Sequence, residues 1–110
     1  MSQISSGSSY ICLDRVIIAN SFFGRLRGLL GRHEMPQNTA LLLPSCRQVH
    51  TFFMRFTIGV IFLSKQGVVL YKEVLKPWQI SKLVKDSKMV VEVEPNALEG
   101  INVGDKLYVR

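Results

Sequence analysis

The sequence lacks several features that would assign it to a class at once. It has 110 residues but only two cysteines and one tryptophan. Two cysteines are too few for a disulfide scaffold, so we expect both to be thiols. No apolar run approaches the roughly 20 residues that cross a bilayer, so we predict no membrane span. The polar start MSQISSGSSY is not a typical signal peptide, and we therefore expect a cytoplasmic protein.

Acidic residues are scarce in the first half of the chain. Between positions 15 and 65, seven basic residues face a single acid, Glu34, whereas positions 66–110 hold seven basic and six acidic residues. A basic half can meet nucleic acid, an anionic lipid surface or an acidic ligand. The basic residues form no dense run, and no helix-turn-helix or finger pattern is present. We therefore favour a solvated basic face and rank nucleic acid last among the partners.

The composition is that of one folded domain. Hydrophobic residues make up 47% of the chain and charged residues 20%, which is typical of globular proteins and not of disordered ones. A chain of this length builds one modest core. We predict a flexible, serine-rich tail at residues 1–9 and a single domain at residues 10–110.

Apolar periodicity in the first half predicts strands and one helix. Residues 10–18 are β-prone, with a break near position 14. Apolar residues at i, i+4, i+7 and i+8 after an N-cap predict a helix over 21–30. A short strand at 39–43 ends at a proline, and residues 49–53 indicate a further strand or the start of an irregular crossing.

The second half predicts β-structure throughout. Residues 57–63 and 68–75 are separated by a four-residue loop ending in Gly67, which favours a hairpin. The alternation in 88–94 predicts a strand with one wet face. A short helical turn at 96–100 and a last strand at 106–109 follow. We predict an α+β fold that is compact and mostly β, with a curled or barrel-like sheet of about six to seven short strands and one helix in the N-terminal half.

Several motifs occur in an order that resembles a known family. They are GLLGR at 28–32, VHTFFMRFTIGVIFL at 49–63, GVV at 67–69, Pro77-Trp78, VVEVEPNA at 90–97, and Gly100-Ile101 followed by Gly104-Asp105. Together they resemble the DUF192 family of small domains of uncharacterised function, over roughly residues 13–110. The resemblance implies a compact, mostly β domain with a helix near its start, and it implies no established reaction.

Two positions depart from the family pattern. The family usually has an aspartate before the V-x-F part of the central strand, where this chain has Gly59. The Gly-Met-Leu-Phe pattern after the first loop is met only loosely, by residues 39–42. These departures argue against transferring an acid–base role to this chain.

The central segment, residues 46–63, holds the candidate chemistry. His50 lies among apolar residues, where an imidazole can be a ligand contact, a base or a hydrogen-bonded core residue. Cys46, His50 and Met54 are soft ligands that suit copper(I). Their spacing of four fits a helix, and this segment does not have a helical pattern. We therefore predict neither a metal nor a cofactor.

Two further residues complete the candidate site. Arg55 could hold an anionic group with its planar guanidinium, although a surface arginine is the simpler interpretation. Trp78 follows Pro77 at a strand end and could wall a shallow ligand site or plug the end of a barrel.

Three functions remain open. The leading hypothesis is a non-catalytic ligand-binding or accessory module with a site at His50, Arg55 and Trp78, whose partner is a small anionic ligand or a protein. The first alternative is a hydrolase- or transferase-like enzyme using Cys46 and His50, although Gly59 leaves no local acid to orient the base. The second alternative is nucleic-acid binding through the basic first half.

Overall fold

Two β-sheets organise the part of the chain that the computed structural model describes, which is residues 2–6, 9–13, 15–18 and 39–109. The predicted helix at 21–30 lies outside these residues. The elements are β1 (Ser2–Ser6), β2 (Ser9–Leu13), β3 (Arg15–Ile18), β4 (Thr39–Pro44), β5 (Ile58–Leu63), β6 (Val69–Leu75), β7 (Met89–Val93), the 3-10 helix η1 (Pro95–Gly100) and β8 (Leu107–Val109).

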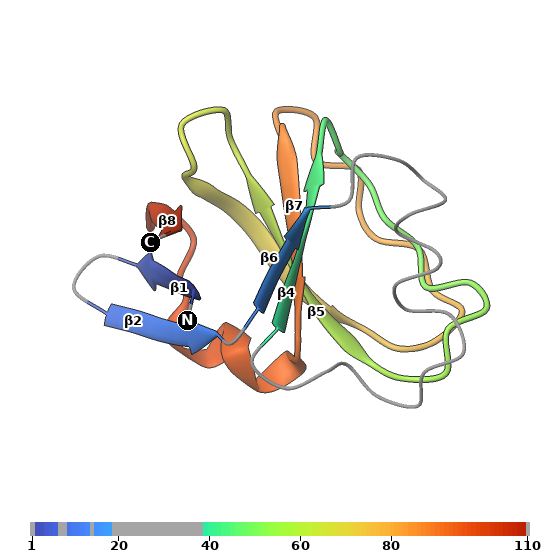
Figure 1. The fold of residues 1–110 in the computed structure, drawn as a ribbon. Coiled ribbons are helices and arrows are strands. Elements are labelled where there is room, and N and C mark those ends of the chain that lie inside the picture. The colour runs from blue at the N-terminus through green and yellow to red at the C-terminus, as the bar shows by residue number, and fades with distance from the viewer. Residues whose placement is uncertain (1, 7–8, 14, 19–38, 110) are drawn as a thin grey trace.

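The larger sheet is open, with the strand order β3-β4-β7-β5-β6 (Figure 1). Its last four strands are antiparallel neighbours, and β3 pairs parallel with β4 at the edge. The mostly β prediction is confirmed. The prediction of one curled or barrel-like sheet of about six to seven strands is wrong, because the largest sheet has five strands and its two edges do not meet.

The hairpin of β5 and β6 follows the prediction. Ile58 pairs with Leu75 and Phe62 with Tyr71 in an antiparallel register. In the connecting turn, the Gly67 amide donates to the Ser64 carbonyl at 2.9 Å. Gly67 has a φ of 84°, a left-handed value that costs glycine little because it has no Cβ.

Both faces of the larger sheet are covered, which explains the apolar run of β5. All six residues of β5 are buried. On one face they pack with residues of the 45–57 segment, and on the other with η1 and the residue that follows it. The predicted wet face of β7 is also wrong: Glu92 is only 1% exposed, on the face of β7 where Val90 packs with residues of the 45–57 segment.

A second, smaller sheet joins strands from the two ends of the chain. Its order is β2-β1-β8, and β1 pairs antiparallel with both neighbours. The segment expected to be a tail therefore contains a strand, Ser2–Ser6. The predicted last strand is confirmed as β8, and the predicted helical turn at 96–100 is confirmed as η1.

Two long loops, residues 45–57 and 76–88, run side by side (Figure 1), and Val49, Met54 and Phe56 of the first loop pack against the larger sheet. Backbone hydrogen bonds join them, including Ser81 N to Val49 O at 2.8 Å and Val84 N to Arg47 O at 2.9 Å. Of the two alternatives predicted for 49–53, the strand is wrong and the irregular crossing is found, since only one isolated bridge, His50 to Ile80, forms there. Within the described residues, no helix is long and apolar enough to cross a membrane.

Candidate functional site

Thr51 fixes the tips of the two long loops to each other. It is completely buried, and its amide donates to the Gln79 carbonyl at 2.8 Å. Its own carbonyl accepts from the amides of Met54 at 3.1 Å and Trp78 at 3.0 Å. A buried peptide group that satisfies both loops in this way holds them in one arrangement.

The Thr51 hydroxyl adds a second layer of bonds. It donates to the Lys76 carbonyl at 2.5 Å and accepts from the Gln79 amide at 2.9 Å. The Gln79 side chain closes the turn, because its Oε1 accepts from the Lys76 amide at 2.8 Å. We call these bonds of Thr51 to Met54, Lys76, Trp78 and Gln79 the Thr51 network.

The Thr51 network presents a group of rings, which we call the aromatic platform: His50, Phe52, Phe53 and Trp78. The His50 and Phe52 rings stack at 4.6 Å. Phe52 lies 6.0 Å from Trp78, and Phe53 lies 4.7 Å from Trp78 at an angle of 59°. Phe53 is 66% exposed and Trp78 60% exposed. The rings therefore contact one another while much of their surface faces solvent.

Two residues of the aromatic platform have left-handed backbones. Phe53 has a φ of 68° and Trp78 a φ of 63°. This conformation brings Cβ close to the following carbonyl oxygen and costs roughly 1–2 kcal/mol for a residue other than glycine. Strain of this kind persists only where surrounding contacts impose it, and it gathers at functional sites. The Thr51 network supplies those contacts.

His50 joins the aromatic platform through a polar contact as well. Its Nδ1 accepts from the Phe52 amide at 3.3 Å. His50 is half-buried, and it ties the stacked pair to the bridge with Ile80.

The predicted site residues are only partly brought together. His50 and Trp78 meet through the ring of Phe52. Arg55 is exposed, and it makes no ion pair with any described residue. The Cys46 thiol donates to the Gln48 carbonyl at 3.3 Å, and no hydrogen bond joins it to His50. The Cys46–His50 pair required by the enzyme alternative is therefore not assembled.

Sequence reasoning missed Thr51, Phe52 and Phe53. The residues TFF fall within the predicted apolar strand, in which alternate side chains would enter the core. The available signal was the pair of adjacent phenylalanines, since a half-buried strand buries only one face and would leave one of the two rings on its wet face. Among the described residues, no three His, Cys, Asp or Glu side chains are grouped as a metal would require.

Comparison with known proteins assigns the family. The family model of DUF192, described as "Uncharacterized ACR", matches residues 4–109. The chain belongs to the DUF192 family. A UPF0127 protein of Pyrococcus furiosus is 34% identical over 97 residues, which cover 84% of both chains. A UPF0127 protein of Thermococcus sibiricus is 30% identical over 99 residues, but this chain spans 64% of that relative's length. The resemblance predicted from the sequence is confirmed.

Two solved structures share the fold of this DUF192 chain. One is a protein of unknown function from Novosphingobium aromaticivorans, with a TM-score of 0.78 and 16% identity over 97% of this chain and 82% of that one. The other, from Sinorhizobium meliloti and provisionally described as a transcription regulator, has a TM-score of 0.78 and 18% identity over 98% and 91%. At these identities the likeness concerns the fold alone.

The position that departs from the DUF192 pattern has a steric explanation. A Cβ on Gly59 would lie 2.9 Å from Cγ of Leu98, closer than real Cβ contacts. Leu98 is 6% exposed and belongs to the core cluster under η1. In this chain, Leu98 therefore occupies the space into which an aspartate at position 59 would extend.

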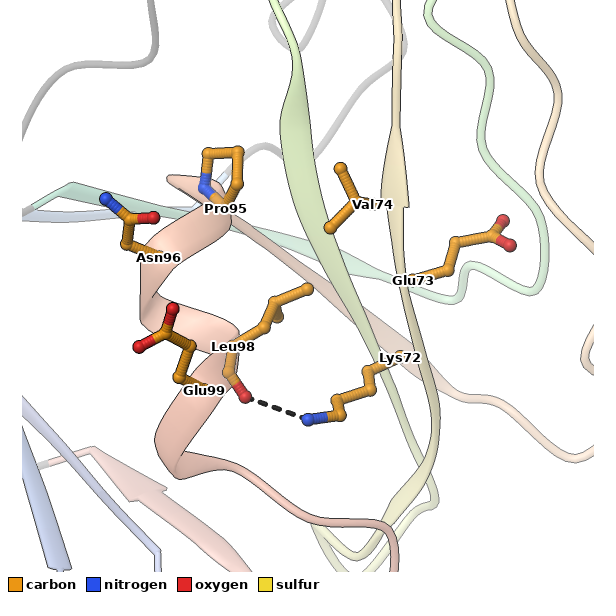
Figure 2. A pocket seen from close by; sticks show the side chains of 7 residues that line it. All are labelled: Lys72, Glu73, Val74, Pro95, Asn96, Leu98 and Glu99. Carbon is orange, nitrogen blue, oxygen red and sulfur yellow. Dashed lines mark hydrogen bonds between the residues drawn. The ribbon is translucent and has the colours of Figure 1, made fainter.

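A cavity of about 420 Å³ opens beside Leu98, between η1 and β6. Figure 2 shows Lys72 extending toward η1, where its Nζ donates to the Leu98 carbonyl at 2.9 Å, while Glu73 extends away. Exposed Asn96 and Glu99 complete the polar lining. The lining combines a cation that already has a partner with acidic side chains, so it presents no charge of one sign to a ligand.

A second polar group lies on the opposite face of β6. The Tyr71 hydroxyl donates to Oε2 of Glu73 at 2.8 Å, and Lys82 Nζ lies 5.2 Å from the centre of the Tyr71 ring. The hydrogen bond to Glu73 raises the pKa of Tyr71 above its usual 10.0, and burial and the charge of Glu73 act in the same direction. This group ties the 76–88 loop to the sheet.

Proposed function

We propose that this DUF192 chain is a non-catalytic binding module whose site is the aromatic platform, with Arg55 beside it. The observation that carries the proposal is the left-handed backbone of two exposed aromatic residues, Phe53 and Trp78. A fold gains no core packing from rings that are more than half exposed. Backbone strain maintained at such rings is the pattern expected of a surface selected for contact.

The Thr51 network supports a binding role because it holds the rings before any ligand arrives. A loop that is already ordered loses less conformational entropy on binding than a mobile one. Exposed aromatic side chains also supply large contact areas at low entropic cost. Catalysis is not needed to explain any of these features, and the thiol of Cys46 is engaged with Gln48.

Trp78 makes the proposal testable, since it is the only tryptophan. Anilinonaphthalene sulfonate joins planar rings to an anionic group, and it accepts energy from tryptophan when it binds nearby. We expect the folded protein to bind this dye with energy transfer from Trp78. Phe53→Ser should weaken the binding several-fold, because the Phe53 ring lies 4.7 Å from Trp78.

Val103→Ser is the matched control. Val103 is 61% exposed, a fraction similar to that of Phe53, but it lies in the turn after η1. Loss of binding in Phe53→Ser alone supports the proposal. No energy transfer with the wild-type chain, or an equal loss in both variants, would remove the aromatic platform as the site.

A further inference from the structure

We infer that the aromatic platform binds the surface of an anionic lipid bilayer. The inference rests on the binding role proposed above and adds the class of partner. It is carried by two features of the same pair of loops. One is a group of projecting apolar side chains, and the other is a set of cations with no acidic partner among the described residues.

Three apolar side chains of the two loops are largely exposed to solvent. Phe53, Trp78 and Ile80 are 66%, 60% and 59% exposed. Ile80 belongs with the rings because its backbone bridges that of His50. Side chains exposed to this degree are suited to act as anchors that insert into a binding partner. The boundary between lipid headgroups and acyl chains receives aromatic and aliphatic side chains of this kind without needing a preformed pocket.

The charges of the two loops are almost all positive. Residues 45–57 and 76–88 hold one acid, Asp86, against six exposed basic residues: Arg47, Arg55, Lys76, Lys82, Lys85 and Lys88. We call these six the cationic rim. None of them forms an ion pair with a described residue. Basic side chains on the loops that carry the apolar anchors match a negatively charged membrane surface, where each cation that reaches the surface contributes roughly a fivefold gain in binding.

The nearest members of the cationic rim stand at the base of the aromatic platform. The Lys76 carbonyl accepts from the Thr51 hydroxyl at 2.5 Å. Arg55 directly follows Met54, whose amide donates to the Thr51 carbonyl at 3.1 Å. The Thr51 network therefore holds the backbones of both cationic residues close to the backbones that carry the rings.

Single-stranded nucleic acid also combines rings with cations, but the geometry fits it less well. Proteins that bind it stack successive bases on aromatic side chains spread along a basic groove. Here each ring of the aromatic platform lies within 6.0 Å of the next. The rings therefore contact one another and form a single compact group, not a series of separate stacking positions.

The test is co-sedimentation of the full chain with vesicles of phosphatidylglycerol and phosphatidylcholine, compared with phosphatidylcholine alone. We expect binding to the anionic vesicles that falls as salt is added, a blue shift of Trp78 emission, and quenching of Trp78 by lipids brominated on the acyl chain. Phe53→Ser should weaken binding roughly tenfold, since the bound protein then lacks an aromatic ring that would enter the bilayer. Arg55→Gln and Lys76→Gln should each weaken it about fivefold, and Val103→Ser should not change it.

Each other outcome overturns the inference in a distinguishable way. Dye binding at Trp78 without vesicle binding leaves the binding module intact and rejects the membrane as its partner. If Phe53→Ser does not change vesicle binding and Trp78 is not quenched, the binding is adsorption of a basic protein by charge alone. Preference for an oligothymidine strand or for polyglutamate over anionic vesicles assigns the aromatic platform to nucleic acid or to an acidic protein.

Discussion

Thr51 and Gln79 are bound to each other through both the main chain and a side chain, although 28 residues separate them. The Thr51 amide donates to the Gln79 carbonyl at 2.8 Å, and the Gln79 amide donates to the Thr51 hydroxyl at 2.9 Å. This pair sets the positions of the loop tips, and through them the positions of Phe53 and Trp78.

Replacing Thr51 by valine should therefore destabilise the fold. The substitution keeps the shape of a completely buried side chain but leaves the Lys76 carbonyl and the Gln79 amide without their partner. Buried polar groups left unpaired cost about 1–3 kcal/mol. Urea unfolding measures this change. Thr57→Val is the control, because Thr57 is half-buried and its side chain bonds no described residue; equal losses in the two variants would reject the role given to Thr51.

Phe53 should reverse the usual order of alanine and glycine. Glycine is normally less stable than alanine because it loses more backbone entropy on folding. At a φ of 68°, however, the alanine Cβ meets the steric cost that glycine avoids, so we expect Phe53→Gly to be about 1 kcal/mol more stable than Phe53→Ala. Phe52, whose φ is negative, should show the normal order. The free energies of unfolding of the four variants test this prediction. If Phe53→Ala is more stable than Phe53→Gly, the backbone of Phe53 is not strained.

Introducing the family's aspartate should be costly in this chain. Gly59→Asp places a carboxylate against Leu98, whose Cγ lies 2.9 Å from the position that the new Cβ would take. We expect a loss of about 2–4 kcal/mol in the free energy of unfolding, from overpacking and from burial of a polar group. Gly100→Asp is the control, since nothing lies within 4 Å of its Cβ position.

Leu98→Ala supplies the cross-check for Gly59. Shortening Leu98 opens the space that the aspartate needs, so the double variant should lose less stability than the two single changes added together. Strict additivity in thermal or urea unfolding would show that Leu98 is not what excludes a side chain at position 59.

Tyr71 should make stability fall at high pH. Its pKa is raised in the folded chain, chiefly by the hydrogen bond to Glu73. As pH rises, the unfolded state loses this proton first, so stability is complete below pH 10.0 and declines as pH passes through the raised folded value. The free energy of unfolding, measured with urea between about pH 9 and pH 11, should decline less steeply in Tyr71→Phe. Parallel curves for the two proteins would exclude this linkage.

Local features of the sequence predicted the parts of the fold that depend on neighbouring residues. The β5–β6 hairpin follows from a turn in which Gly67 takes a left-handed φ. That conformational preference depends on the identity of a single residue, glycine. The strand Thr39–Pro44 and the turn η1 follow from short apolar runs and prolines. The family was likewise evident from the order of its motifs.

Features that depend on distant residues were not predictable in the same way. Alternation predicts a wet face for Glu92 because it reports only local polarity. Glu92 is buried because it lies between Leu41 of β4 and Val60 of β5, on the face of the sheet that packs against residues 45–57. The parallel pairing of β3 with β4 has no turn signal at all. Of the predicted site, His50 and Trp78 meet only through the ring of Phe52. That arrangement depends on the bonds from Thr51 to Gln79, which join two separate loops.

The most direct measurement is the accessibility of Trp78 to acrylamide in the free protein, read from its fluorescence. An open aromatic platform requires a tryptophan that is 60% exposed, and we predict emission and quenching close to those of tryptophan in water. Blue-shifted emission with strong protection from acrylamide would contradict the proposed site, because a covered Trp78 leaves no open aromatic platform for a dye, a membrane or any other partner.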